Sequence, residues 1–228
     1  MNVKKLLLFA AILLLQFFGI KWIAAYPEAV ERYYSTGLFE YISVLFRYLF
    51  GWIPFSFGDV MYTAIIIYAI IALVKLIKNR FKTLGIFCTK ALLFANVIYF
   101  AFHFLWGFNY YRLPLHKALN IENEYTTEEL ISLTQRLIKE ANALHETLQP
   151  TDSLPVEFQQ NLEEIFDKTP DGYAIVEDNF PELEYYPKSI KNSLYRYPLS
   201  YMGFGGYLNP ITLESQVNGL LPAHRWPL

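Results

Sequence analysis

The chain has 228 residues, of which 54% are hydrophobic and 18% aromatic, and its formal net charge is −2. This composition is too apolar for an ordinary soluble domain and favours a membrane protein. Residues through Phe108 carry ten Lys and Arg against four Asp and Glu, whereas the remainder carries nine against seventeen. Because an acidic half repels phosphate backbones, the charge argues against nucleic acid as a partner.

Residues 1–108 are expected to form a membrane anchor with three spans, at about 6–25, 57–77 and 84–106. Each apolar stretch has roughly the 20 residues that a helix needs to cross the hydrocarbon core of a bilayer. The first stretch follows two lysines, a pattern that a cleaved signal peptide also shows. We favour a retained helix, because Lys21 beside Trp22 can extend the span, and the signal peptide is the alternative.

Residues 37–50, between the first two spans, predict an interfacial helix. Glu40, Ser43 and Arg47 recur on one stripe, and apolar residues cover the rest of the surface. A helix with a thin polar face suits the boundary between membrane and water.

The orientation follows from the loop between the second and third spans, which contains Lys75, Lys78, Arg80 and Lys82. Short basic loops stay in the cytoplasm, so we expect a cytoplasmic N-terminus and an extracytoplasmic domain over residues 109–228. Aromatic and basic side chains at the outer end of the third span are the expected interface anchors: Trp106, Tyr110, Tyr111 and Arg112. His103, one turn earlier, has no acidic or histidine neighbour at i+4 and is interpreted as a satisfied interfacial histidine.

The outer domain is expected to be α+β. Thr126 and Glu129 have capping-box spacing, and leucines then recur every three or four residues up to Pro150, which predicts an amphipathic helix. Two shorter helices are expected over 155–167 and 172–179, separated at Pro170.

A β-hairpin is expected near the C-terminus. Apolar and small residues alternate with polar ones from Ile211 to Asn218, which is typical of a half-buried strand. As an edge strand it could pair with an extended peptide. The candidate pairing residues are Ile211, Leu213, Ser215, Val217 and Asn218.

Two motifs are candidates for chemical sites. His145-Glu146 begins like a zinc-peptidase helix, but Gln149 stands where the second histidine belongs, so a solvated helix face is the better interpretation. Gly203 to Gly206 lacks the third glycine of a dinucleotide fingerprint and indicates a bulge or a close backbone approach. The sequence therefore predicts no catalytic residue and no metal ligand.

Trp106 to Arg112 and the run from Tyr201 to Leu221, Tyr-Met-Gly-Phe-Gly-Gly-Tyr-Leu-Asn-Pro-Ile-Thr-Leu-Glu-Ser-Gln-Val-Asn-Gly-Leu-Leu, carry a family resemblance. With three spans before them, they resemble an uncharacterised bacterial membrane-protein family catalogued as domain of unknown function 3810. The resemblance covers the whole chain, including residues 50–56. It implies zincin-like peptidase relatives that continue into a His-Glu-x-x-His helix.

This chain is expected to be truncated before that helix, so the resemblance transfers no catalytic or metal residue. Zinc is expected only with the helix present, and the chain by itself is expected to be inactive. The first hypothesis is therefore a multi-pass membrane protein whose outward domain resembles the N-terminal part of a zinc metallopeptidase. The alternative is a non-enzymatic envelope protein that binds a protein or peptide partner through its acidic outer domain and exposed hairpin.

Overall fold

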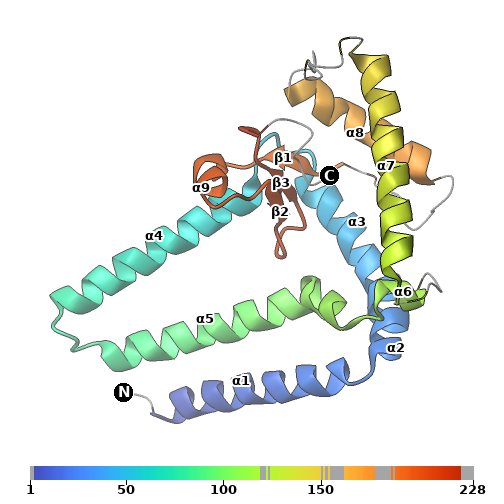
Figure 1. The fold of residues 1–228 in the computed structure, drawn as a ribbon. Coiled ribbons are helices and arrows are strands. Elements are labelled where there is room, and N and C mark those ends of the chain that lie inside the picture. The colour runs from blue at the N-terminus through green and yellow to red at the C-terminus, as the bar shows by residue number, and fades with distance from the viewer. Residues whose placement is uncertain are drawn as a thin grey trace. The chain divides into compact units, whose positions relative to one another are not determined.

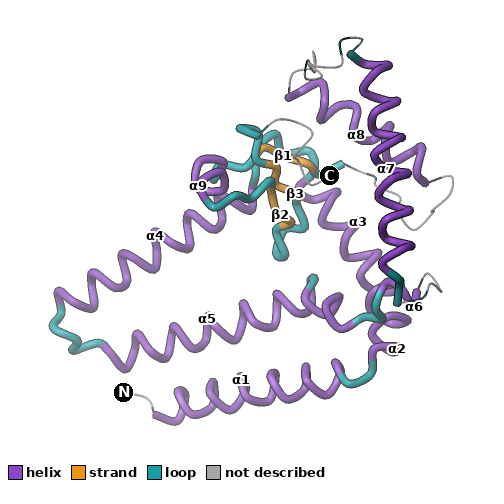
Figure 2. Tube along the Cα trace, in the orientation of Figure 1, coloured by secondary structure: helices purple, strands orange, loops and turns teal. Residues whose placement is uncertain are grey.

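The computed structural model describes residues 3–118, 122, 124–149, 151, 154, 162–177, 186 and 188–221. The chain divides into two compact units, one made of Met1–Arg112 with Phe166–Leu228 and the other of Leu113–Ile165. Each unit is described by itself. The described residues are mostly helical, with a small sheet near the C-terminus (Figure 2).

Three long apolar helices dominate the first unit: α1 (Val3–Ala24), α4 (Phe57–Lys78) and α5 (Leu84–Leu105). Each has 22 residues and is long and apolar enough to cross a membrane. The three predicted spans are thus confirmed as candidate membrane-spanning helices. Their side chains are mostly exposed, which is compatible with a surrounding lipid bilayer.

Helices α1 and α5 lie side by side (Figure 1). Asn96 of α5 donates a hydrogen bond to the carbonyl of Phe9 in α1 at 3.0 Å and another to Leu92 at 2.7 Å. Gln16 of α1 donates to the Asn96 side-chain oxygen at 3.4 Å. Hydrogen bonds from side-chain amides hold apolar helices together in a membrane, where lipid supplies no hydrophobic driving force for helix association.

A continuous helical segment follows α1 and is longer than the predicted helix at 37–50. It consists of α2 (Pro27–Ala29), the π-helical η1 (Val30–Leu38) and α3 (Phe39–Phe50). Pro27 occupies the first helical turn, where its missing N–H has no cost. Tyr34 of η1 donates to the carbonyl of Phe104 at 2.8 Å, so this segment is attached to the end of α5.

The second unit contains α6 (Leu115–Ala118) and α7 (Thr127–Leu148). The predicted capping box is confirmed: Glu129 N–H donates to the Thr126 hydroxyl, and Thr126 N–H donates to the Glu129 carboxylate. The hydrogen bonds that the Glu129 carboxylate accepts from the Thr126 N–H and hydroxyl lower the pKa of Glu129. The amphipathic helix therefore begins at the predicted residue.

Helix α8 (Leu162–Glu177) differs from the prediction of two helices. It continues through Pro170, whose ring removes one backbone hydrogen bond without ending the helix. The rest of the first predicted helix, from Pro155, lies outside the described residues.

The sheet consists of β1 (Ile190–Asn192), β2 (Gly206–Leu208) and β3 (Ser215–Val217), and the short helix α9 (Arg196–Tyr201) lies between β1 and β2 in the chain. The strand order is β1-β3-β2, with β1 parallel and β2 antiparallel to β3. The predicted hairpin is present as the β2–β3 pair. β3 is the central strand of the sheet.

Candidate functional site

The strand predicted over Ile211–Asn218 is corrected in two respects. It is shorter, because Leu213 has a left-handed backbone with φ of 54° and only Ser215–Val217 pair as a strand. It is also not an edge, because β3 is paired with β1 on one side and β2 on the other. The candidate pairing residues Ser215 and Val217 therefore have their strand neighbours within this chain.

The polar face of that segment is buried, whereas the alternation predicted a solvated face. Exposure is 1% or less at each of its four polar side chains, Thr212, Glu214, Gln216 and Asn218. Buried polar groups need hydrogen-bond partners, and those of Glu214 and Gln216 include groups at the start of α4. The resulting group is called the α4 polar cluster: Ser56, Asp59, Lys191, Ser193, Tyr207, Asn209, Thr212, Glu214 and Gln216.

Glu214 binds the N-terminus of α4. Its carboxylate accepts hydrogen bonds from the backbone N–H groups of Phe57 at 3.1 Å and Gly58 at 2.6 Å. The Thr212 hydroxyl donates a third bond at 2.8 Å. The first N–H groups of a helix have no intrahelical acceptor and carry partial positive charge, so a carboxylate stabilises them.

Lys191 of β1 forms a buried ion pair with Glu214. Its ammonium group lies 2.7 Å from the Glu214 carboxylate, and the two side chains are 4% and 0% exposed. The same ammonium group donates to the carbonyl of Phe50, the last residue of α3, at 2.6 Å. One lysine thus connects α3, β1 and the segment before β3.

Asp59 is the second buried carboxylate, in the first turn of α4. It accepts hydrogen bonds from the Ser193 hydroxyl at 2.9 Å, from Leu194 N–H at 2.8 Å and from the Tyr207 hydroxyl. Burial raises the pKa of Tyr207, and its bond to Asp59 raises it further. Asp59 therefore holds both the end of β1 and strand β2 against α4.

Ser56 and Asn209 form further hydrogen bonds within the α4 polar cluster. The Ser56 hydroxyl caps α4 by accepting from Asp59 N–H at 3.2 Å, and Gln216 donates to the same oxygen at 3.0 Å. Asn209 accepts from Thr212 N–H at 3.1 Å. Gly58 allows this close approach, because a side chain there would collide with the Asn209 amide.

These contacts indicate a structural role for the α4 polar cluster and not a catalytic one. Asp59 and Glu214 are fully buried and have their hydrogen-bonding partners within the protein, so a substrate has no access to either carboxylate. Within the part of the chain that the structure describes, no group of three His, Cys, Asp or Glu side chains could hold a metal ion. The zinc set of a peptidase therefore does not fit the described residues.

The predicted interface anchors lie at the end of α5 and in the adjoining 3-10 helix η2 (Gly107–Tyr111). Tyr110 is 68% exposed, and Arg112 forms a bidentate ion pair with Glu31 at 2.9 and 2.5 Å. That pairing raises the pKa of Arg112. His103 is buried and its Nδ1 lies 2.9 Å from the Tyr99 carbonyl, in agreement with a satisfied histidine.

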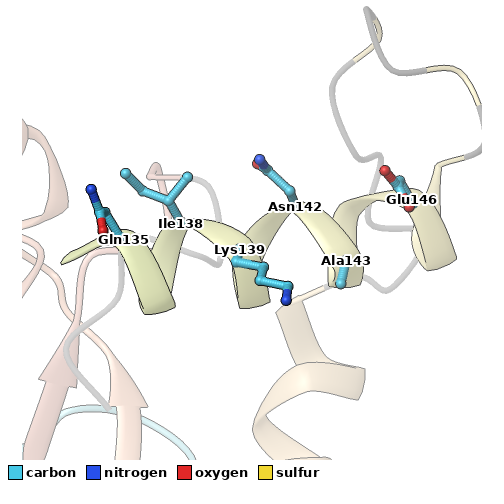
Figure 3. Close-up of a pocket in the computed structure, with 6 residues that line it drawn as sticks. All are labelled: Gln135, Ile138, Lys139, Asn142, Ala143 and Glu146. Carbon is cyan, nitrogen blue, oxygen red and sulfur yellow. The ribbon is translucent and has the colours of Figure 1, made fainter. Parts of the chain in front are cut away.

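The remaining candidate surface is a shallow depression along α7 in the second unit. Figure 3 shows its lining residues, all from one helix: Gln135, Ile138, Lys139, Asn142, Ala143 and Glu146. His145 contacts the Leu154 carbonyl at 3.0 Å through Nε2. The side chains do not converge on a common point, so this surface offers no acid–base pair.

Sequence reasoning missed Asp59, Lys191, Glu214 and Tyr207 as a group. One local signal was available, because Ser56 followed three residues later by Asp59 before an apolar run is a helix-capping pattern. The hydrogen bonds of Glu214 with Gly58 and of Asp59 with Ser193 join residues more than 130 positions apart in the chain. No local pattern identifies contacts at that separation.

The fold and this cluster define a protein with three membrane-length apolar helices and a small sheet bonded to the start of one of them. Residues 34–228 match the family described as "Protein of unknown function (DUF3810)", and the chain belongs to that family. The predicted membership of this family is thus confirmed over residues 34–228. No curated protein and no solved structure matches the chain.

Proposed function

We propose that this protein is a multi-pass membrane protein that carries an outward-facing domain of zinc-metallopeptidase type at the membrane surface. The observation that carries the proposal is the α4 polar cluster. Its hydrogen bonds join strand β3 and the residue before it to the start of α4, a membrane-length helix. Such bonding fixes the sheet at a defined height relative to a bilayer that α4 crosses. It does so with the two buried carboxylates Asp59 and Glu214.

Two further observations support the outward orientation and the peptidase type. The turn between α4 and α5 is basic, which favours a cytoplasmic position for it and an outer position for the start of α4. The family resemblance of the run from Tyr201 to Leu221 implies zincin-like relatives in which a metal-binding helix follows. No catalytic step is assigned to the described residues, because they offer no zinc set.

The test measures zinc content and peptide hydrolysis of the natural gene product, purified in detergent. We expect bound zinc and chelator-sensitive hydrolysis, because a peptidase of this type uses zinc to activate the attacking water. His145→Ala in the natural product is the matched control, and its zinc content should not change.

A natural product without zinc and without hydrolysis would contradict the peptidase type. It would favour the second candidate, a non-enzymatic envelope protein that binds a partner through its acidic outer half. The observation behind this candidate is that α7 exposes an apolar stripe, with Leu133, Leu137 and Leu144 at 44%, 52% and 64%. A photo-crosslinker at Leu137 should then capture a partner in intact membranes, whereas one at Lys139, on another face of the helix, should not.

A further inference from the structure

The segment from Leu194 to Leu208, which contains α9 and β2, differs in composition from the acidic half around it. Its 15 residues include five aromatic side chains, one arginine and no Asp or Glu. The rest of the chain beyond Phe108 has a strong excess of acidic residues. A segment rich in Tyr and Phe with a single positive charge suits the interface of a lipid bilayer.

Four large side chains on one part of this segment are exposed to solvent. The exposed members lie in α9 and the turn after it: Tyr197 at 59%, Tyr201 at 92%, Met202 at 61% and Phe204 at 54%. Leu199, by contrast, is only 7% exposed and faces the protein interior. Large apolar side chains that are exposed together within eight residues indicate a contact with a partner or a membrane.

The turn that presents these side chains is rigidly built. Phe204 N–H donates to the Leu199 carbonyl at 2.9 Å and Gly203 N–H donates to Ser200 at 3.1 Å, which is the Schellman pattern at a helix end. Gly203 has φ of 77°, the left-handed conformation that this motif requires. Asn218 fastens the turn to the sheet by donating to the Phe204 carbonyl at 3.1 Å. The exposed aromatics are therefore held in place.

The height of the segment is set by its contact with α4. The hydroxyl of Tyr195, the residue before α9, lies 2.7 Å from the Thr63 hydroxyl and donates to the Asp59 carbonyl at 3.2 Å. Thr63 is six residues into α4, or about 9 Å along its axis from Phe57. In Figure 1, α9 accordingly lies beside the first turns of α4. If α4 crosses a hydrocarbon core of about 30 Å, its 22 residues, about 33 Å long, place Thr63 several ångströms inside the outer edge of that core, a depth that the apolar face of an interfacial helix reaches.

We propose that α9 and its following turn form a second membrane contact, which inserts Tyr197, Tyr201, Met202 and Phe204 into the lipid interface beside the start of α4. The occupant of this surface is lipid because the surface adjoins a membrane-length helix and the segment from Leu194 to Leu208 contains no Asp or Glu. Arg196 adds attraction to anionic headgroups. The inference rests on α4 crossing the bilayer, as the proposed function also does, but it is independent of zinc.

The test measures the depth of a single label. In a Cys88→Ala background, which removes the native thiol, Tyr201→Cys carries an environment-sensitive fluorophore, and the protein is reconstituted in vesicles of phosphatidylcholine and phosphatidylglycerol. Spin-labelled lipids and aqueous iodide serve as the two quenchers. Lys168→Cys, at an exposed charged position in α8 of the same unit, is the matched control.

We expect the label at position 201 to be quenched several-fold more by spin-labelled lipid than the label at position 168, and to be protected from iodide. Since Tyr201 is 92% exposed, its replacement removes no packing. Met202→Cys should give the same result. Equal iodide quenching at positions 201 and 168 would overturn the proposal, and so would protection at position 201 from both quenchers, which would indicate a contact with another protein chain. Lipid quenching without zinc in the natural product would leave this proposal standing and remove only the peptidase type.

Discussion

At the scale of single residues, the most informative feature is a buried ion pair that binds a helix terminus. Glu214 and Lys191 are 0% and 4% exposed, and each also has backbone partners. A buried ion pair adds little net stability over an apolar pair of the same shape, because both charges lose hydration. Removal of one partner destabilises the folded protein strongly, because the other charge is left buried without compensation.

The first prediction concerns this pair. Glu214→Gln should lower the free energy of unfolding by about 3–5 kcal/mol, because Lys191 stays buried without its counter-charge. The double variant with Lys191→Met should recover part of the loss. Denaturant titrations in detergent measure both values.

The matched control is the exposed ion pair of Lys188 with Asp167, at 2.8 Å with side chains 34% and 71% exposed. Lys188→Met should lower the free energy of unfolding by at most about 1 kcal/mol. Similar losses for Lys188→Met and Glu214→Gln would contradict the importance of burial at Glu214.

The second prediction concerns Tyr207, whose pKa is raised by burial and by its bond to Asp59. A raised pKa means that the folded state favours the protonated phenol. Its contribution to stability is thus complete below the unfolded value of about 10 and is lost as the pH rises further. The free energy of unfolding should therefore fall more steeply above pH 10 in the native chain than in Tyr207→Phe. Parallel slopes in the two proteins would show that Tyr207 does not titrate as described.

At the scale of elements, α4 begins where it does because groups far along the chain satisfy its first turn. Ser56 supplies a local cap, and Glu214 supplies a remote one. This arrangement requires the backbone of α4 to approach the segment before β3 closely. Gly58 is the position of closest approach, because a side chain there would meet Asn209 and lie 2.8 Å from the Thr212 hydroxyl.

The third prediction tests that approach with two glycines in helices. Gly58→Ala should lower the free energy of unfolding by about 1–3 kcal/mol, because the new methyl group forces the sheet away from α4. Gly172→Ala in α8, where nothing lies within 4 Å of the added atom, should raise it by up to about 1 kcal/mol. Thermal or denaturant unfolding in detergent compares the two, and a tolerated Gly58→Ala would argue against tight packing of the sheet on α4.

At the scale of the whole molecule, charge and hydropathy divide the chain in the same place. The basic part contains the three apolar helices, and the acidic part begins after Phe108. The four basic residues from Lys75 to Lys82 surround the turn between α4 and α5. The positive-inside rule then predicts on which side of the membrane each part lies.

The fourth prediction is this topology. In the Cys88→Ala background, a membrane-impermeant maleimide should label Glu146→Cys in intact cells. It should label Asn79→Cys, in the turn after α4, only after permeabilisation. Both introduced positions are exposed, so access depends on the membrane side. Labelling with the opposite pattern would reverse the orientation.

The sequence by itself determined the features that depend on local composition and period. The three apolar helices and the capping box at Thr126 follow from residues that are neighbours in the chain, so they were predicted nearly to the residue. The family was also recognisable, from the continuous run Tyr201 to Leu221.

Only the tertiary structure decided where β3 lies and what surrounds its polar residues. Alternation in a strand is a local signal, and it assigns a polar face to water unless a distant element supplies hydrogen bonds. Here α4 supplies them to Glu214 from 156 residues away in the chain, with the N–H of Gly58. The predicted edge strand is therefore the central strand of the sheet, with a buried polar face.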